Sequence, residues 1–346
     1  MWLRKLSSIV VFVFVLVIGG LFSVTTVFPN EVMKWIRTDY FQNENVTLAK
    51  QKNTQLEDGT KVTRDVQYDK QDVNGYLDIY HTTKGNKNPE TFVYIHGGGY
   101  IWGDKQGGDP TGGDATFKDS TIYRMLDAGY NVVSYNYALA PDVSFPTAIL
   151  QLNRGLDFIN QNATKYDLNM DKVILGGGSA GGNLAGVLTN IQTNPDYAKV
   201  MNTRPVLKKD QIKAVFFQGG AADNSKIGVT DSSIFDWLFY NVARVYLESN
   251  NLYESEFLTK SNVTDYVTSD FPPVFISDGN KGTPYGQNFV LYSKFQELGV
   301  ESKLSYFHKE YAGPLGHGFD EFGGKYADIS MENLIEFLQT NVREKS

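Results

Sequence analysis

Residues 173–185 bring an apolar run of strand type into a cluster of glycines that surrounds a single serine, Ser179. A helix-compatible stretch, residues 183–191, follows directly. The sequence Gly-Gly-Ser-Ala-Gly at 177–181 is the G-x-S-x-G pattern of a sharp strand-to-helix turn, in which the serine hydroxyl projects above the sheet edge. An ordinary glycine-rich turn would read the same way, because short motifs also occur by chance. The rest of the chain has to decide whether Ser179 is a nucleophile.

Short apolar runs alternate with helix-like segments along most of the chain. We expect strands at residues 62–68, 76–82, 91–95, 131–135, 173–175, 213–218, 274–277 and 303–307, and helices at residues 117–128, 146–160, 183–191, 234–248, 286–298 and 326–341. Alternation of this kind predicts an α/β fold, with a mostly parallel central sheet and helices on both of its faces. We assign residues 31–346 to this domain.

Residues 221–268 interrupt the alternation and are rich in aromatic side chains. Such a segment suits an insertion that forms a small cap or lid above the sheet. The same aromatic residues would also suit an ordinary core.

The N-terminal residues predict a membrane segment. Arg4 and Lys5 precede residues 6–28, which carry no charge and are dominated by Val, Ile, Leu and Phe. About 20 such residues suffice to cross the hydrocarbon core of a bilayer. We predict an uncleaved signal anchor at residues 1–30, because residues 23–27 make a poor cleavage site; a cleaved signal, which would leave a secreted protein, is the alternative. The positive-inside rule then places the catalytic domain of a single-pass protein on the outer side of the cell membrane.

Composition excludes several classes of function. The formal net charge is −7 and no basic residues are clustered, so we expect no nucleic-acid partner. The chain has no cysteine, which excludes disulfides, thiolate metal ligands and a cysteine nucleophile. Hydrophobic residues make up 41% and charged residues 21%, as in globular proteins.

A serine nucleophile needs a general base within hydrogen-bond reach, and the chain has only four histidines. His317 lies in a glycine-flanked loop, residues 315–319, between the last expected strand and the last expected helix. A base must reach over the sheet edge from such a loop. We therefore predict that His317 is the base, and assign no chemistry to His81 or His308.

An ester carbonyl that is attacked becomes an oxyanion, which backbone N–H groups can stabilise. The sequence His-Gly-Gly-Gly at 96–99 is the second glycine cluster at the end of an expected strand. We predict that Gly98, Gly99 and Ala180 donate to the oxyanion and that His96 orients the loop. A phosphate-binding loop fits poorly, because neither a P-loop lysine nor a G-x-G-x-x-G pattern follows.

Four motifs occur in a fixed order: His-Gly-Gly-Gly at 96–99, Tyr-x-Leu-Ala-Pro at 137–141 followed by Phe-Pro, Gly-Gly-Ser-Ala-Gly-Gly-Asn-Leu-Ala at 177–185, and His-Gly-Phe at 317–319. Over about residues 60–343 the chain resembles the hormone-sensitive-lipase-like esterases of the α/β-hydrolase fold. The resemblance implies a Ser-Asp-His triad in that chain order, an oxyanion hole in the His-Gly-Gly-Gly loop, a cap over an acyl pocket, and no cofactor or metal.

The chain departs from that family in three places. The family's usual Tyr-Arg-Leu-Ala-Pro-Glu is Tyr-Ala-Leu-Ala-Pro-Asp here, at 137–142. Gly178 stands before the serine, where the family usually carries an acidic or similar residue. Ungapped spacing places the family's triad acid at Gly282, which has no carboxylate. We choose Asp278, at the end of the expected strand, as the acid that orients His317. The remaining candidates are Asp223 and Glu310.

These residues predict a carboxylesterase-type serine hydrolase acting on a small-molecule ester outside the membrane. The same nucleophile would serve peptide hydrolysis or acyl transfer to a surface polymer. A catalytically inactive hydrolase fold that serves as a binding module is the alternative from another class, and the missing acid at residue 282 is its only support.

Overall fold

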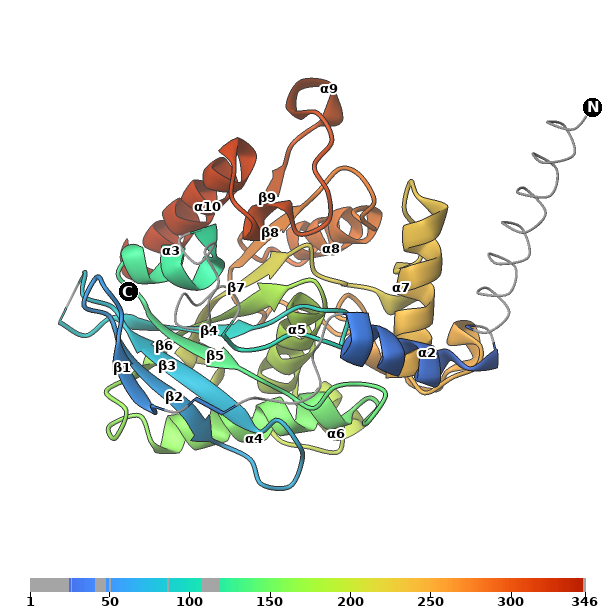
Figure 1. The fold of residues 1–346 in the computed structure, drawn as a ribbon. Coiled ribbons are helices and arrows are strands. Elements are labelled where there is room, and N and C mark those ends of the chain that lie inside the picture. The colour runs from blue at the N-terminus through green and yellow to red at the C-terminus, as the bar shows by residue number, and fades with distance from the viewer. Residues whose placement is uncertain are drawn as a thin grey trace, which may run out of the picture.

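The computed structural model describes residues 25, 27–40, 48–49, 51–85, 87–106 and 119–344. Within these residues, nine strands form one sheet in the order β1-β2-β3-β5-β4-β6-β7-β8-β9 (Figure 1). The strands are β1 (Asn53–Gln55), β2 (Lys61–Gln67), β3 (Tyr76–His81), β4 (Glu90–Ile95), β5 (Asn131–Tyr135), β6 (Asn169–Gly178), β7 (Ile212–Gln218), β8 (Val274–Asp278) and β9 (Ser302–Tyr306).

The sheet is parallel from β5 through β9, and β1, β2 and β3 extend it as antiparallel strands. In a parallel sheet all carboxyl ends meet at one edge, where ligands bind in open α/β folds. The glycine cluster after β4, Ser179 after β6 and Asp278 at the end of β8 therefore share that edge.

Helices cover both faces of the sheet (Figure 1). The α-helices are α2 (Pro29–Trp35), α3 (Thr121–Asp127), α4 (Thr147–Gln161), α5 (Ala180–Thr193), α6 (Pro195–Val200), α7 (Ser233–Tyr246), α8 (Gly286–Glu297), α9 (Lys309–Ala312) and α10 (Lys325–Leu338). Successive residues of a strand point to opposite faces. Accordingly, Val93 and Ile95 of β4 pack in the core with α4 and α5, whereas Phe92 and Tyr94 pack in the core with α3 and α10.

The predicted α/β-hydrolase sheet is confirmed, and the expected strands lie within a few residues of the observed ones. All the residues of β4 and β5 are buried, so neither strand shows the alternation of apolar and polar residues that a sheet with one solvated face would have. The helix expected at 117–128 begins only at Thr121. Ser120 caps it by accepting a hydrogen bond from the Tyr123 N–H.

The structure contradicts the predicted N-terminal transmembrane helix. None of the helices formed by the described residues combines the length and apolar character needed to cross a membrane. The first described helix, α2, has seven residues and a proline in its first turn. At 1.5 Å per residue it spans about 10 Å, a third of a hydrocarbon core. Residues 1–24 and 26 of the expected segment lie outside the described residues.

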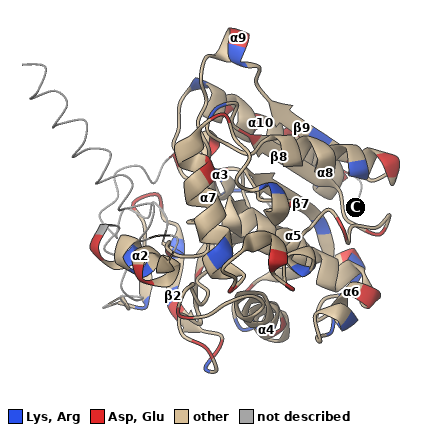
Figure 2. Cartoon of the chain, turned by 90° about the vertical axis from the view of Figure 1, so that its right-hand side faces the viewer, with Lys and Arg blue, Asp and Glu red and all other residues tan. Residues whose placement is uncertain are grey.

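Residues 221–268, the expected cap, contain α7 and three short 3₁₀ turns, at Asn224–Lys226, Leu252–Glu254 and Thr259–Ser261. Helix α7 lies beside α2 at the carboxyl edge of the sheet (Figures 1 and 2). Its role as a cap stays a prediction. Figure 2 shows basic and acidic residues interspersed on the outer elements, as with Glu31 and Lys34 of α2.

Candidate active site

Ser179 occupies a strained turn between β6 and α5. Its backbone has φ 51° and ψ −117°, outside the regions that a residue with a side chain normally adopts. The Ser179 N–H donates to the Gln218 carbonyl at 2.7 Å, which holds the turn against β7. A Cβ atom on Gly177 or on Gly181 would lie 2.0 Å from the Ile95 carbonyl oxygen. The glycines on both sides of the serine are therefore required by close packing against β4.

His317 stands directly over the serine. Its Nε2 atom lies 2.8 Å from Ser179 Oγ, although 138 residues separate the two in sequence. The loop turns at Gly318, whose φ of 69° favours glycine. Burial lowers the pKa of His317 to about 4, against a smaller opposing effect of the Asp320 charge. The imidazole is thus neutral near pH 7, as a general base must be.

The other ring nitrogen of His317 reaches a carboxylate through a hydroxyl group. His317 Nδ1 lies 3.1 Å from Thr283 Oγ1, and this hydroxyl donates to Asp278 Oδ1 at 2.5 Å. The direct distance from His317 Nδ1 to Asp278 Oδ1 is 4.0 Å, too long for a hydrogen bond. These contacts assign the Nδ1–H tautomer, which leaves Nε2 free to accept the serine proton.

Asp278 is fully buried at the end of β8 and is held from several sides. Besides Thr283, the Asn288 side chain donates to Oδ2 at 2.7 Å and the Gly279 N–H donates to Oδ1 at 2.7 Å. Burial raises the pKa of Asp278 to about 6, while these hydrogen bonds act in the opposite direction. Thr283 and Asn288 had no signal in the sequence, because their role depends on how the loop after β8 and α8 pack around the carboxylate.

The other acid candidates lie elsewhere. Asp223 accepts hydrogen bonds from Ser225, and Glu310 is an exposed neighbour of His308. Gly282, the position given by ungapped spacing, donates its N–H to Asp231. A further carboxylate, Asp320, is buried three residues beyond His317, where it accepts hydrogen bonds from Ser277 and Ser330.

The three predicted oxyanion donors border the same cavity as Ser179 and His317. Among the hydrogen bonds of the described residues, none uses the N–H of Gly98, Gly99 or Ala180 as a donor. Gly98 has φ 94°, and a Cβ atom there would lie 2.1 Å from the Trp102 carbonyl oxygen. Free N–H groups beside a serine hydroxyl are the arrangement that stabilises a tetrahedral oxyanion.

His96 holds the start of this loop and does not contact the serine. Its Nδ1 lies 2.8 Å from the Gly97 carbonyl oxygen, and its ring stacks on Tyr137 with a centroid distance of 4.4 Å. The Tyr137 hydroxyl donates to the His96 and Gly97 carbonyls. Tyr137 of the Tyr-x-Leu-Ala-Pro motif thus fixes the backbone of the glycine loop.

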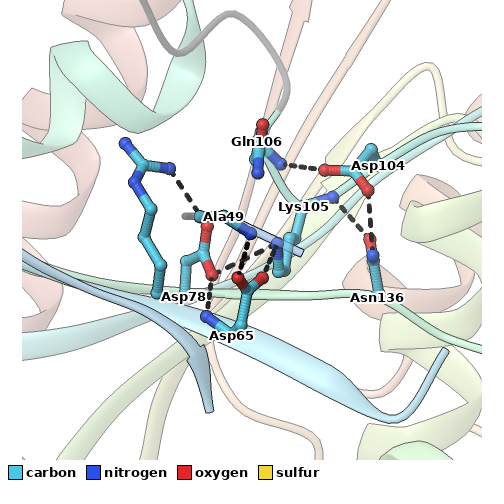
Figure 3. A network of polar contacts seen from close by, with 8 residues as sticks. Ala49, Asp65, Asp78, Asp104, Lys105, Gln106 and Asn136 are labelled. Carbon is cyan, nitrogen blue, oxygen red and sulfur yellow. Dashed lines mark hydrogen bonds and ion pairs between the residues drawn. The ribbon is translucent and has the colours of Figure 1, made fainter. Parts of the chain in front are cut away.

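A buried ionic network anchors the far end of the same loop (Figure 3). Lys105 Nζ forms ion pairs with Asp65 at 2.9 Å and Asp78 at 3.2 Å, and all three side chains are inaccessible to solvent. The Lys105 N–H donates to the side chain of Asn136, which in turn donates to Asp104. Burial alone would lower the pKa of Lys105, but the neighbouring carboxylates raise it. The charged form of Lys105 therefore ties the loop to β2 and β3.

A cavity of about 400 Å³ opens at the nucleophile. Helix α7 contributes Phe235, Leu238, Phe239 and Val242 to its wall, and the Phe239 ring lies 5.2 Å from the His317 ring between centroids. Such a volume and apolar wall suit a small ligand with one reactive polar group. The cavity is thus formed by the sheet edge and by the segment expected to be a cap.

Comparisons with known proteins relate the chain to one family and to several solved structures. A family model described as BD-FAE matches residues 77–295, which include Ser179 and Asp278 but end before His317. A protein of Acanthamoeba polyphaga mimivirus that is named as an alpha/beta hydrolase is 26% identical over 227 residues. That match covers 64% of this chain and 60% of the relative, so the chain spans less than two thirds of the relative's length.

Several solved esterase structures share the fold. Esterase B from Lactobacillus rhamnosis superposes with a TM-score of 0.66 at 22% identity, over 83% of this chain and 86% of that one. A carbohydrate esterase from gut microbiota gives a TM-score of 0.63 at 16% identity, over 84% of this chain and 99% of that one. A carboxylesterase from Lactobacillus plantarum gives 0.58 at 18% identity, over 76% and 92%.

Proposed function

The chain belongs to the BD-FAE family, and on this basis we propose that it hydrolyses carboxylic esters with Ser179 as the nucleophile. Membership confirms the predicted resemblance to α/β-hydrolase esterases, and with it a hydrolase-type enzyme at the level of the family. The observation that carries the proposal is the 2.8 Å contact between Ser179 Oγ and His317 Nε2. A neutral imidazole in that position can accept the hydroxyl proton as the serine attacks a carbonyl carbon.

The first half of the reaction uses groups already in place. The proton of Ser179 moves to His317 Nε2, which makes the imidazole a cation while the substrate carbonyl becomes an oxyanion. The N–H groups of Gly98, Gly99 and Ala180 stabilise that oxyanion. Thr283 and Asp278 stabilise the imidazolium through Nδ1–H. Collapse of the tetrahedral intermediate passes the proton from His317 to the leaving alcohol.

In the second half, water attacks the acyl-enzyme and His317 again accepts the proton. The acid product leaves and Ser179 recovers its hydroxyl. Every step uses side chains and backbone groups of this chain, so the proposal includes no cofactor or metal. The cavity of about 400 Å³ and its aromatic wall favour small esters with apolar acyl groups.

The proposal is tested with the purified full-length chain and p-nitrophenyl esters of acetate and butyrate. We expect hydrolysis by the wild-type protein and loss of at least about 10³-fold in kcat for Ser179→Ala. A fluorophosphonate probe should label the wild-type protein nearly stoichiometrically and leave Ser179→Ala unlabelled. Equal ester hydrolysis by the two proteins would exclude the mechanism.

The alternatives from the sequence remain distinguishable. Acyl transfer and peptide hydrolysis would use the same serine, and product analysis with an added alcohol or amine acceptor separates them from ester hydrolysis. The inactive-module alternative rested on the missing acid at residue 282, and the contacts of Asp278 argue against it. Action outside the membrane stays a prediction, because it follows from residues 1–28 alone.

A further inference from the structure

A carboxyl group that the mechanism above does not use lines the cavity. Glu321 is the last residue of the 3₁₀ turn Phe319–Glu321, four residues after His317. Its N–H donates to the Gly318 carbonyl at 3.0 Å, so the chain folds back and directs the side chain to the cavity that Ser179 and His317 border. One loop therefore supplies both the base and this carboxyl.

The Glu321 carboxyl is packed against the residue before the nucleophile. A Cβ atom on Gly178 would lie 1.8 Å from Glu321 Oε1 and 3.0 Å from Oε2. Unlike many glycines of this chain, Gly178 does not have a positive φ, so its backbone conformation would accept a side chain. The Glu321 side chain, which comes from the His317 loop, fills the space beside Ser179 that a side chain on Gly178 would otherwise occupy.

Within the part of the chain that the structure describes, the Glu321 carboxyl has no partner. No hydrogen bond or ion pair of the described residues ends on the Glu321 side chain, and no other described residue that lines the cavity carries a carboxyl group. A partly buried polar group in an apolar wall is costly unless it finds a partner. Glu321 lines the cavity, so a molecule bound there can supply such a partner.

The protonation state of the Glu321 carboxyl limits which ligand groups can form hydrogen bonds with it. Burial, and then the nearby charge of Asp320, raises the pKa of Glu321 to about 8. Near pH 7 the group is therefore mainly a neutral acid with one O–H donor and one carbonyl acceptor. A hydroxyl group can both donate and accept and so matches it, whereas an ammonium group requires the ionised form.

We propose that Glu321 is a specificity-determining residue that hydrogen-bonds a substrate hydroxyl next to the scissile ester, so that esters of polyols or of hydroxy acids are preferred. This inference rests on the esterase function proposed above. It explains two features together: the unpartnered carboxyl beside the nucleophile, and a glycine at residue 178.

The test compares matched esters that differ only in hydroxyl groups. Propyl butyrate and 2,3-dihydroxypropyl butyrate probe the alcohol side, and p-nitrophenyl butyrate and p-nitrophenyl 3-hydroxybutyrate probe the acyl side. The measured quantity is the ratio of kcat/KM for the hydroxylated ester to that for the plain ester. We expect a wild-type preference for the hydroxylated ester of one pair and a roughly tenfold lower ratio in Glu321→Met, as the loss of one hydrogen bond gives.

Three further variants separate recognition from structural damage. Glu321→Gln keeps a donor and an acceptor, so its ratio should stay within about threefold of wild type. Gly178→Ala retains Glu321 but displaces its carboxyl, and should lower the ratio as Glu321→Met does. The double variant Gly178→Asp with Glu321→Ala places a carboxyl group at residue 178 instead of residue 321. It should restore part of the preference for the hydroxylated ester. Fluorophosphonate labelling of Ser179 verifies that each variant is folded at the site.

The outcomes are distinct. Equal wild-type kcat/KM within both ester pairs would overturn the inference and leave the esterase function intact. A preference for the hydroxylated ester that persists in Glu321→Met and Gly178→Ala would also overturn the inference, because another group would then bind the substrate hydroxyl. No hydrolysis of any ester by the wild-type protein would instead refute the proposed function, and this inference with it.

Discussion

Asp278 Oδ1 lies 4.0 Å from His317 Nδ1, and the hydroxyl group of Thr283 bridges the two. The carboxylate therefore acts on the imidazole through a side chain that is itself a donor and an acceptor. A hydroxyl in this position orients the imidazole ring and transmits the stabilising charge, but it adds one more group that must be in place.

Removing the Thr283 hydroxyl is the direct test of this bridge. In Thr283→Val the methyl group occupies the same volume but cannot accept from Nδ1–H, so a buried donor is left without a partner. We expect kcat for p-nitrophenyl butyrate to fall about 10–100-fold, whereas Thr283→Ser should stay within about threefold of wild type. Full activity of Thr283→Val would indicate that His317 and Asp278 bond directly during turnover.

The two buried carboxylates near His317 should differ in importance. Asp278→Asn removes the charge that stabilises the imidazolium and should lower kcat by about 10³–10⁴-fold. Asp320 contacts Ser277 and Ser330 rather than the imidazole, so Asp320→Asn should affect kcat much less. Steady-state kinetics of both variants decide the assignment, and a reversed order would make Asp320 the functional acid.

The pKa values of the site predict the acidic side of the pH profile. His317 works only when neutral, and its pKa is lowered to about 4, so the base is lost only as pH falls through about 4. The pKa of Asp278 is raised to about 6, so its charge is lost first, as pH falls through about 6. We expect kcat/KM to fall in two steps below about pH 7, and ionisation of Glu321, whose pKa is raised to about 8, to add a separate change on the alkaline side. Asp278→Asn should lack the upper step, and a single step near pH 6.5 would contradict these shifts.

The glycine loop offers a test of oxyanion stabilisation. A methyl group at residue 98 would meet the Trp102 carbonyl at 2.1 Å and would be strained by the positive φ, so Gly98→Ala must move the loop. Loss of one oxyanion donor costs about 10²–10³-fold in kcat. We expect that loss with a smaller change in KM. A change confined to KM would assign the loop to substrate binding alone.

The ionic network in Figure 3 should matter for stability. Lys105→Met removes the ammonium group that pairs with buried Asp65 and Asp78 and leaves Arg64 as the cation beside Asp78; breaking a buried pair costs about 3–5 kcal/mol. Urea denaturation of the full chain measures the loss. The exposed ion pair of Lys199 with Asp196 gives a matched control, for which we expect no measurable change in Lys199→Ala. Equal midpoints of Lys105→Met and wild type would show that the network does not stabilise the fold.

The sequence predicted the parts of the fold that depend on local pattern. Apolar runs such as residues 173–175 indicate strands buried on both faces, and the glycines around Ser179 indicate a turn that only small residues permit. Asp278 was placed by the end of its strand, against the ungapped spacing that pointed to Gly282. The predicted membrane helix was wrong, because no helix of the described residues is long and apolar enough to cross a membrane; residues 6–24 and 26 of the apolar run lie outside the described part of the chain.

The sequence alone determined which residues stand at the ends of the parallel strands, because strand and turn signals are local and parallel strands share one edge. Only the tertiary structure decided how these residues meet. Thr283 enters the site because the loop after β8 folds over Asp278, and Glu321 enters because the turn after His317 reverses toward Gly178. Such contacts depend on side-chain packing between segments far apart in the chain, which no spacing within one motif specifies.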